Sequence, residues 1–191
     1  MVWDKGFLGA SIDAYRNDHG TVVEEVGKNR MRRDKLALAG EVRDIAGFIT
    51  TVRGQIEGSD YKHTELNGDG SAGTTFTNKG TDGRLEAVHR RFRLGDGRLE
   101  GVLGLQSESS RFAALGSEAN VPLTHTRQTA AFVLEQWTFD SGRQLSAGVR
   151  AERVRIGSEG DADPSTPQFG PAQSRSFSPR SASLGATARG V

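Results

Sequence analysis

The chain has 191 residues, and its 25 basic and 24 acidic side chains leave a formal net charge of only +1. Balanced charge without basic patches gives no reason to expect a nucleic-acid or acidic partner, and the absence of cysteine excludes disulfide frameworks, Cys-ligated zinc and thiol catalysis. With 35% apolar residues and 25 glycines, the chain is too polar for a helical membrane protein and short of apolar residues for a large soluble core.

The apolar residues alternate with polar ones, which argues against disorder and predicts β-strands. Eight segments carry apolar or small side chains at alternate positions. In chain order these sets are Leu8, Ala10, Ile12 and Ala14; Leu36, Leu38, Gly40 and Val42; Val52, Gly54 and Ile56; Leu85 and Ala87; Leu99, Leu103 and Leu105; Ala130, Phe132 and Leu134; Leu145, Ala147, Val149 and Ala151; and Ala182, Leu184, Ala186 and Ala188. The chain is therefore predicted to be all-β and antiparallel, with about eight strands.

The connections between these strands are expected to alternate in length. Residues 17–29, 63–74, 109–125 and 157–175 are predicted to be long loops, and residues 44–47, 91–97 and 140–143 shorter turns. Long loops on one edge of a sheet and short turns on the other are typical of an up-and-down transmembrane β-barrel, with the short turns in the periplasm.

Aromatic residues are expected to form two girdles, because a barrel places such rings at both headgroup levels of the bilayer. The first set lies near the N-terminus or a short turn, and comprises Trp3, Phe7, Phe48, Phe92, Trp137 and Phe139. The second set lies beside the predicted long loops, and comprises Tyr15, Tyr61, Phe76 and Phe112. The alternative is that these rings cap the core of a sandwich.

The charged faces bear on the width of the barrel. The charges predicted to share one face are Asp13, Lys35, Glu41, Arg43, Arg53, Glu57, Arg84, Glu86, Arg127, Glu135, Arg150 and Glu152. An unpaired buried ion is costly, so a wide barrel with a hydrated or plugged interior is favoured. Two alternatives stay open. One is a complete eight-stranded barrel with a structural or adhesin role, in which the strands of Leu8 and Leu184 would meet; the other is a soluble β-sandwich that serves as a binding module.

Several long strings resemble, in order, the middle barrel strands of TonB-dependent receptors, nearest to the branch of zinc-uptake receptors of Gram-negative bacteria. They are GFLGASIDAYRNDHG, RMRRDKLALAGEVRDIAGF, GSDYKHTEL, GTTFTNKGTDGRLEAVH, GVLGLQSESSRFAALGSEANVPLTHTR and FVLEQWTF. The resemblance implies an outer-membrane receptor with a plug inside a 22-stranded barrel. Such a receptor imports a scarce nutrient, expected here to be zinc or a metal chelate, with energy from TonB. Its implied partners are outer-membrane lipid, the plug domain, TonB and the imported ligand.

Other parts of this family have no counterpart in the sequence, which has no plug, no TonB-box-like segment, no signal peptide and no terminal aromatic residue. Residues 1–191 are therefore expected to form one incomplete, open stretch of barrel wall that is inactive by itself. Two open sheet edges would also favour aggregation.

Candidate ligand residues are sparse. His19, His63 and His125 fall in or near the predicted loops, with Glu24, Glu25, Glu65 and Glu118 nearby, but no pair has ligand spacing, so unrelated surface histidines are favoured. The stretch from Glu65 to Phe76 places Asn67, Asp69 and Gly70 as in a calcium loop but lacks its first Asp and last Glu, which favours an ordinary turn. Glu159, Asp161 and Asp163 are interpreted as solvated loop charges. No catalytic, cofactor or metal residue is assigned, and the chain is not expected to be an enzyme.

Overall fold

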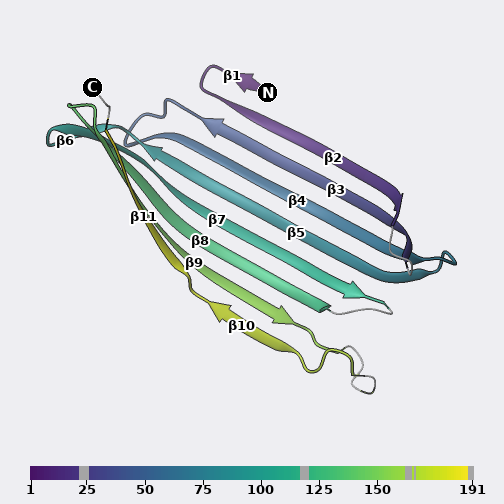
Figure 1. The fold of residues 1–191 in the computed structure, drawn as a ribbon. Helices are drawn as coiled ribbons and strands as arrows, with labels where there is room; N and C mark the ends of the chain where they lie inside the picture. The colour runs from purple at the N-terminus through teal and green to yellow at the C-terminus, as the bar shows by residue number, and fades with distance from the viewer. Residues whose placement is uncertain (22–25, 117–120, 162–164, 166, 189–191) are drawn as a thin grey trace.

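The computed structural model consists of one antiparallel sheet with connecting turns (Figure 1). It describes all residues except 22–25, 117–120, 162–164, 166 and 189–191. The strands are β1 (Val2–Trp3), β2 (Gly6–Gly20), β3 (Val26–Val42), β4 (Ile49–Asn67), β5 (Ala72–His89), β6 (Phe92–Leu94), β7 (Gly97–Leu115), β8 (Val121–Phe139), β9 (Gln144–Ser158), β10 (Gln173–Phe177) and β11 (Arg180–Thr187). The described residues include no helix that could cross a membrane.

Seven long strands follow one another in chain order across the sheet, from β2 to β9 with the short β6 set aside. An eighth, interrupted strand lies against β9, where β10 pairs with residues 154–158 and β11 with residues 144–151. The interruption falls at Pro179, which has no N–H to donate but whose carbonyl accepts a hydrogen bond from the Glu152 amide at 3.0 Å. The predicted all-β, antiparallel, up-and-down wall of about eight strands is confirmed.

The sheet is open and has no second layer (Figure 1). Pairing ends at β1 and β2 on one side and at β10 and β11 on the other, so the strands of Leu8 and Leu184 do not meet. Among the described residues, the buried apolar side chains are only three alanines, whereas Ile12 and Leu184 are each 84% exposed. The structure therefore has neither the closure of an eight-stranded barrel nor the internal core of a sandwich.

The prediction of long loops is wrong for residues 17–29, 63–74 and 109–125, because the strands continue through most of these segments. The ladder between β2 and β3 runs out to Gly20 opposite Lys28, and that between β3 and β4 to Val26 opposite Asn67. These outer halves carry too few apolar residues at alternate positions for period-2 apolar alternation to give a signal there. A long connection survives only between β9 and β10, at residues 159–172.

The register sorts the side chains into two faces, since residues directly opposite each other in a ladder lie on the same side. We call one the apolar face, with the row Leu8, Gly40, Gly54, Leu85, Leu105, Ala131 and Ala151. We call the other the charged face, with the row Glu41, Arg53, Glu86, Gly104, Phe132 and Arg150. Seven of the eight apolar sets read from the sequence lie on the apolar face.

The exception is β8, where the predicted faces are reversed. Phe132 lies opposite Gly104 and Arg150, and Leu134 opposite Val102, so Ala130, Phe132 and Leu134 belong to the charged face. Ala131 and Val133 continue the apolar face, and Arg127 and Glu135 share that face with them. Both sets contain apolar side chains in this strand, so alternation alone did not determine which one faced outwards.

The girdle prediction is correct in part. At the short-turn edge, Trp137 and Phe139 stack with ring centroids 4.5 Å apart, and Phe48 lies 6.3 Å from Phe92. Phe7, however, lies opposite Glu41 on the charged face. The four aromatics of the second predicted girdle also lie on that face, in the ladder positions of Arg33, Asn78 and His63. These aromatics lie toward the loop edge of the sheet, as predicted. They do not lie on the predicted apolar face, because side chains alternate between the two faces along a strand and these four occupy positions of the charged face.

The apolar residues form a band that slants across the strands. One ladder row runs from Leu8 in β2 to Ala151 in β9. Leu8 is the first residue of the apolar set of β2, whereas Ala151 is the last residue of the apolar set of β9, although the two strands run in the same direction. The band therefore shifts by about one residue per strand. With a rise of about 3.4 Å per residue and about 4.8 Å between strands, this shift corresponds to a strand tilt of roughly 35°.

Candidate functional site

The charged face carries its ionic groups mostly as pairs. In its central rows, the Glu86 carboxylate accepts hydrogen bonds from Arg53 and from Arg84 at 2.6 Å. Glu86 is 9% exposed, so it is the most enclosed carboxylate among the described residues. Two guanidinium groups compensate its charge, which is the condition for keeping an ion out of bulk water.

Phe132 lies at the centre of this network. Its ring lies across Gly104, where any added Cβ would collide with it, and the Arg84 and Arg150 guanidinium carbons lie 4.5 and 5.9 Å from the ring centroid. Arg150 also donates to Glu152 at 2.7 Å and to Gln106 at 3.1 Å. One aromatic ring that contacts two arginines thus joins the charges of β5 to those of β9 through two cation–π contacts.

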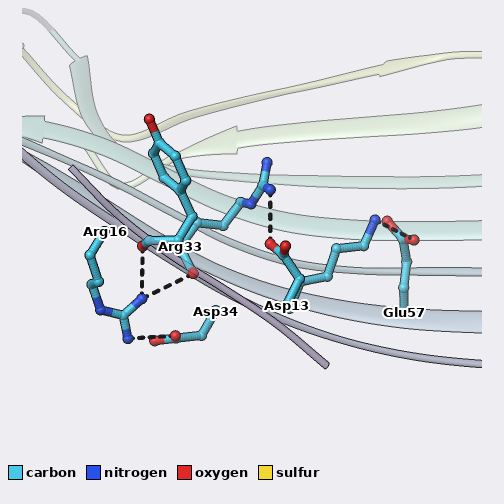
Figure 2. A network of polar contacts seen from close by, with 7 residues as sticks. Asp13, Arg16, Arg33, Asp34 and Glu57 are labelled. Atoms are coloured by element: carbon cyan, nitrogen blue, oxygen red, sulfur yellow. Dashed lines mark hydrogen bonds and ion pairs between the residues drawn. The ribbon is translucent and has the colours of Figure 1, made fainter. Parts of the chain in front are cut away.

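A second network lies toward the N-terminal edge of the sheet (Figure 2). Arg33 donates to Asp13 at 2.9 Å, and Lys35 pairs with Glu57 at 2.8 Å. Arg16 and Asp34, 2.6 Å apart, belong to the same view but to the apolar face by register. These pairs are about half exposed, so each contributes at most about 1 kcal/mol to stability. The two pairs on the charged face, Arg33 with Asp13 and Lys35 with Glu57, make that face suited to water and not to acyl chains.

The three histidines do not form one site. His19 and His63 lie on the charged face, opposite Asn29 and Met31, whereas His125 lies on the apolar face opposite Arg111. His63 stacks on Phe76 at 4.5 Å, and His125 contacts the Glu159 carboxylate at 2.8 Å. Within the part of the chain that the structure describes, no three His, Cys, Asp or Glu residues are arranged to hold a metal ion. Glu24, Glu25, Glu118 and Asp163 lie outside that part.

The stretch that resembled a calcium loop is a tight turn between β4 and β5. Asp69 accepts hydrogen bonds from the Ser71 hydroxyl at 2.6 Å and the Ser71 amide at 2.9 Å, and these bonds lower the pKa of its carboxyl. The Asn67 side-chain amide donates to the same hydroxyl at 2.9 Å. The polar groups thus close the turn on themselves.

Asp161 has a structural role in the loop that the sequence did not indicate. Its carboxylate accepts hydrogen bonds from the backbone amides of Gln168, Phe169 and Gly170 at 2.7–2.8 Å. The amides of Phe169, then of Gln168, are the main causes that lower its pKa. With these three hydrogen bonds, Asp161 holds residues 168–170 of the connection between β9 and β10 in place. The only sequence signal was an acidic residue several positions before a Phe-Gly pair.

A polar pair on the apolar face was also missed. His89 Nε2 contacts a Glu135 carboxylate oxygen at 3.0 Å, and the imidazole stacks on Phe48 with ring centroids 5.2 Å apart. Glu135 lies directly opposite Gly101, and an added Cβ on that glycine would meet its carboxylate. Because Gly101 has no side chain, the Glu135 carboxylate has room to lie across the ladder from it, beside the aromatic girdle.

Comparison with known proteins supports the fold. No protein-family model and no curated protein matches the sequence. Among 26 solved chains that match the structure is the copper transporter OprC, with a TM-score of 0.68 at 13% sequence identity. The match covers 95% of this chain and 31% of the transporter chain, so the chain spans about a third of that protein's length. At this identity, the likeness shows a shared fold.

Proposed function

We propose that the chain is a non-enzymatic stretch of the wall of an outer-membrane receptor that imports a scarce nutrient, with a metal ion or metal chelate as the substrate class. Its apolar face would contact lipid, and its charged face would line a hydrated interior. In the intact receptor, a plug domain and TonB would control passage through that interior. The similarity to a copper transporter and the resemblance to TonB-dependent receptors support a metal as the substrate class. The two different faces of the sheet support its place in a barrel wall.

The slanted apolar band is the observation that carries this proposal. Its side chains are largely exposed, as for Leu105 at 59% and Val149 at 60%, and no second layer covers them. A soluble protein of this size rarely leaves so large an apolar surface in water. The slant of roughly 35° is that of strands in membrane barrels, whose apolar belt is level with the bilayer while the strands are not.

Lipid contact can be tested by labelling, since the chain contains no cysteine. The full chain would be refolded into phospholipid vesicles as Leu105→Cys or, as the control on the charged face, Gln106→Cys, and labelled with a fluorophore. Nitroxides on the lipid acyl chains should quench the label at position 105 much more than at 106. Equal quenching at the two positions would contradict the wall proposal.

The import role requires a separate test. Disrupting the reading frame that encodes this chain should reduce the accumulation of zinc or copper by cells in chelator-treated medium, and restoring the frame should recover it. Accumulation should also fall when TonB is removed. Unchanged uptake of both metals after disruption would refute the metal assignment but leave the membrane location standing. The chain alone in vesicles should show no TonB-dependent influx, because its sheet is open.

A further inference from the structure

Beyond the apolar band, toward the loop edge of the sheet, the apolar face becomes cationic. We call six of these residues the basic belt: Arg32, Lys62, Arg111, Arg127, Arg153 and Arg155. Each is exposed. They stand two to six residues past the last residue of the apolar band in their strands, as Arg153 does after Ala151 and Arg111 after Leu105, and single apolar residues such as Leu115 lie further out on the same face. The belt therefore follows the slanted border of the band.

The ladders place several of these cations directly opposite one another. Arg32 lies between Arg16 and Lys62, which occupy the same ladder position on its two neighbouring strands. Arg111 lies opposite Lys79, and Arg127 opposite Arg155. Directly opposed side chains have Cβ atoms about 5 Å apart, and like charges at that position are destabilising. The sheet thus bears a cost that an anion between the cations would remove.

The protein itself does not supply enough anions. On this part of the apolar face, Asp34 pairs with Arg16 at 2.6 Å and Asp60 with Lys79 at 3.4 Å. No residue that the structure describes forms an ion pair with any member of the basic belt. The charged face differs sharply, because Arg53, Arg84 and Arg150 all contact carboxylates there. The unpaired cations are concentrated on the face that the proposed function turns to lipid.

One shallow groove leads from the apolar band to Arg111 of the basic belt, and a second lies within the band. The first, of about 640 Å³, runs over the small residues Gly58, Thr81 and Ser109, with Ile12 and Leu36 on its apolar side. Its polar lining comprises Arg111 and Lys79 together with Asp34 and Asp60, the two carboxylates already paired with Arg16 and Lys79. The second, of about 860 Å³, is lined mainly by Leu85, Leu103, Leu105, Val133 and Val149 of the band. An occupant of the first groove that also contacts Arg111 combines a hydrocarbon chain with an anionic head.

From this geometry we infer that the basic belt binds the phosphate groups of a phosphorylated glycolipid in the leaflet on the loop side, with acyl chains against the apolar band. Guanidinium groups bind phosphate with two parallel hydrogen bonds, which suits the five arginines among the six residues. The opposed cations would share phosphates instead of repelling one another. This inference rests on the proposed function, since it requires the apolar band to lie in the bilayer.

The test compares diphosphorylated lipid A with its dephosphorylated form, titrated against the full chain in zwitterionic micelles. The triple variant Arg127→Gln, Arg153→Gln and Arg155→Gln removes three belt charges. The matched control, Arg90→Gln, Arg98→Gln and Arg143→Gln, removes three exposed arginines at the opposite edge of the sheet. A basic residue near an anionic lipid surface contributes about 1 kcal/mol, or about five-fold in affinity. The belt variant should therefore weaken the Kd for diphosphorylated lipid A by more than about ten-fold, and the control by less than about two-fold.

Two further readouts make the outcome decisive. In lipid-free micelles, Arg127→Gln should leave the unfolding midpoint unchanged or raise it, because the charge opposite Arg155 is removed; with diphosphorylated lipid A it should lower the midpoint relative to wild type. Equal affinity for the two forms of lipid A, or equal weakening by the belt and control variants, would overturn the inference. Acyl-chain quenching at position 105 separates the two proposals. If quenching persists while the phosphate effect is absent, only the belt is wrong; if quenching is absent, both fail.

Discussion

Gly104 shows how one residue without a side chain organises the charged face. The Phe132 ring occupies the space above it, between Arg84 and Arg150, and a Cβ at position 104 would meet the ring atoms. An aromatic ring that covers a glycine across a ladder is a device that fixes register in curved sheets. Sequence alternation contained no trace of this contact, because it depends on which face of β8 meets β7.

Replacing Gly104 with Ala should destabilise the folded chain by about 1–3 kcal/mol, because the ring must leave its position and its cation–π contacts. Urea unfolding in detergent, followed by far-UV circular dichroism, would measure the change. Gly58→Ala is the control, since the nearest atoms to its added Cβ lie at 4.0 Å. Phe132→Leu in the Gly104→Ala background should recover part of the loss. Equal effects of the two Gly→Ala changes would contradict this account.

The hydrogen bonds of Asp161 should make the order of residues 168–170 sensitive to acid. Backbone amides of residues 168–170 lower its folded pKa below the unfolded value of about 3.9, so the stability that it contributes is present above that pH. The contribution should be lost as the pH falls through the lowered folded pKa. Hydrogen-exchange protection of the Gln168, Phe169 and Gly170 amides should be high at neutral pH and fall in strong acid.

Asp161→Asn should reduce that protection at neutral pH as well, because a neutral amide is a weaker acceptor for three N–H donors. Glu159→Gln is the matched control: its carboxylate contacts His125 and leaves those amides untouched. Protection that is the same in wild type and Asp161→Asn would show that the loop is ordered by other contacts.

Strand β8 is the element in which the face predicted from the sequence differs from the face that the ladders give. Alternation in β8 predicts Phe132 and Leu134 on the apolar face, whereas the ladders place Ala131 and Val133 there. Single-cysteine labels at Val133 and Leu134 in vesicles should therefore differ. Acyl-chain nitroxides should quench the label at Val133 strongly and the label at Leu134 weakly. The reverse result would restore the sequence reading and reject the register between β7 and β8.

The outer halves of the strands illustrate another element that sequence reasoning missed. Residues such as Arg30 and Asp18, or Thr64 and Thr75, pair across long ladders although neither face is apolar. Their order comes from backbone hydrogen bonds that extend from the paired inner halves, and from local contacts such as that of Arg30 with Asp18 at 3.5 Å. Periodicity detects burial in core or lipid, so it has no signal where a strand is wet on both sides.

For the whole molecule, the slant of the apolar band predicts the orientation of the strands. If the band lies level in a bilayer, the strands of the refolded chain should tilt by about 35–45° from the membrane normal. Polarised infrared spectroscopy of the amide I band in oriented bilayers would measure this angle. Strands lying flat on the surface would refute a spanning sheet, as would a random orientation. Heat-denatured chain added to the same bilayers provides the unoriented control.

The amino-acid sequence is enough to predict the fold class, the antiparallel up-and-down order, about eight strands and the face of seven of the eight apolar sets, because period-2 alternation records directly which side chains avoid water. It also gave reason not to assign a metal to His19, His63 and His125. Only the tertiary structure decided the face of β8, the face of the aromatics near the loop edge, the true strand lengths and the roles of Gly104, Asp161 and Glu135. These features depend on which residues stand opposite one another. Register joins positions far apart in the chain, and no local pattern encodes it.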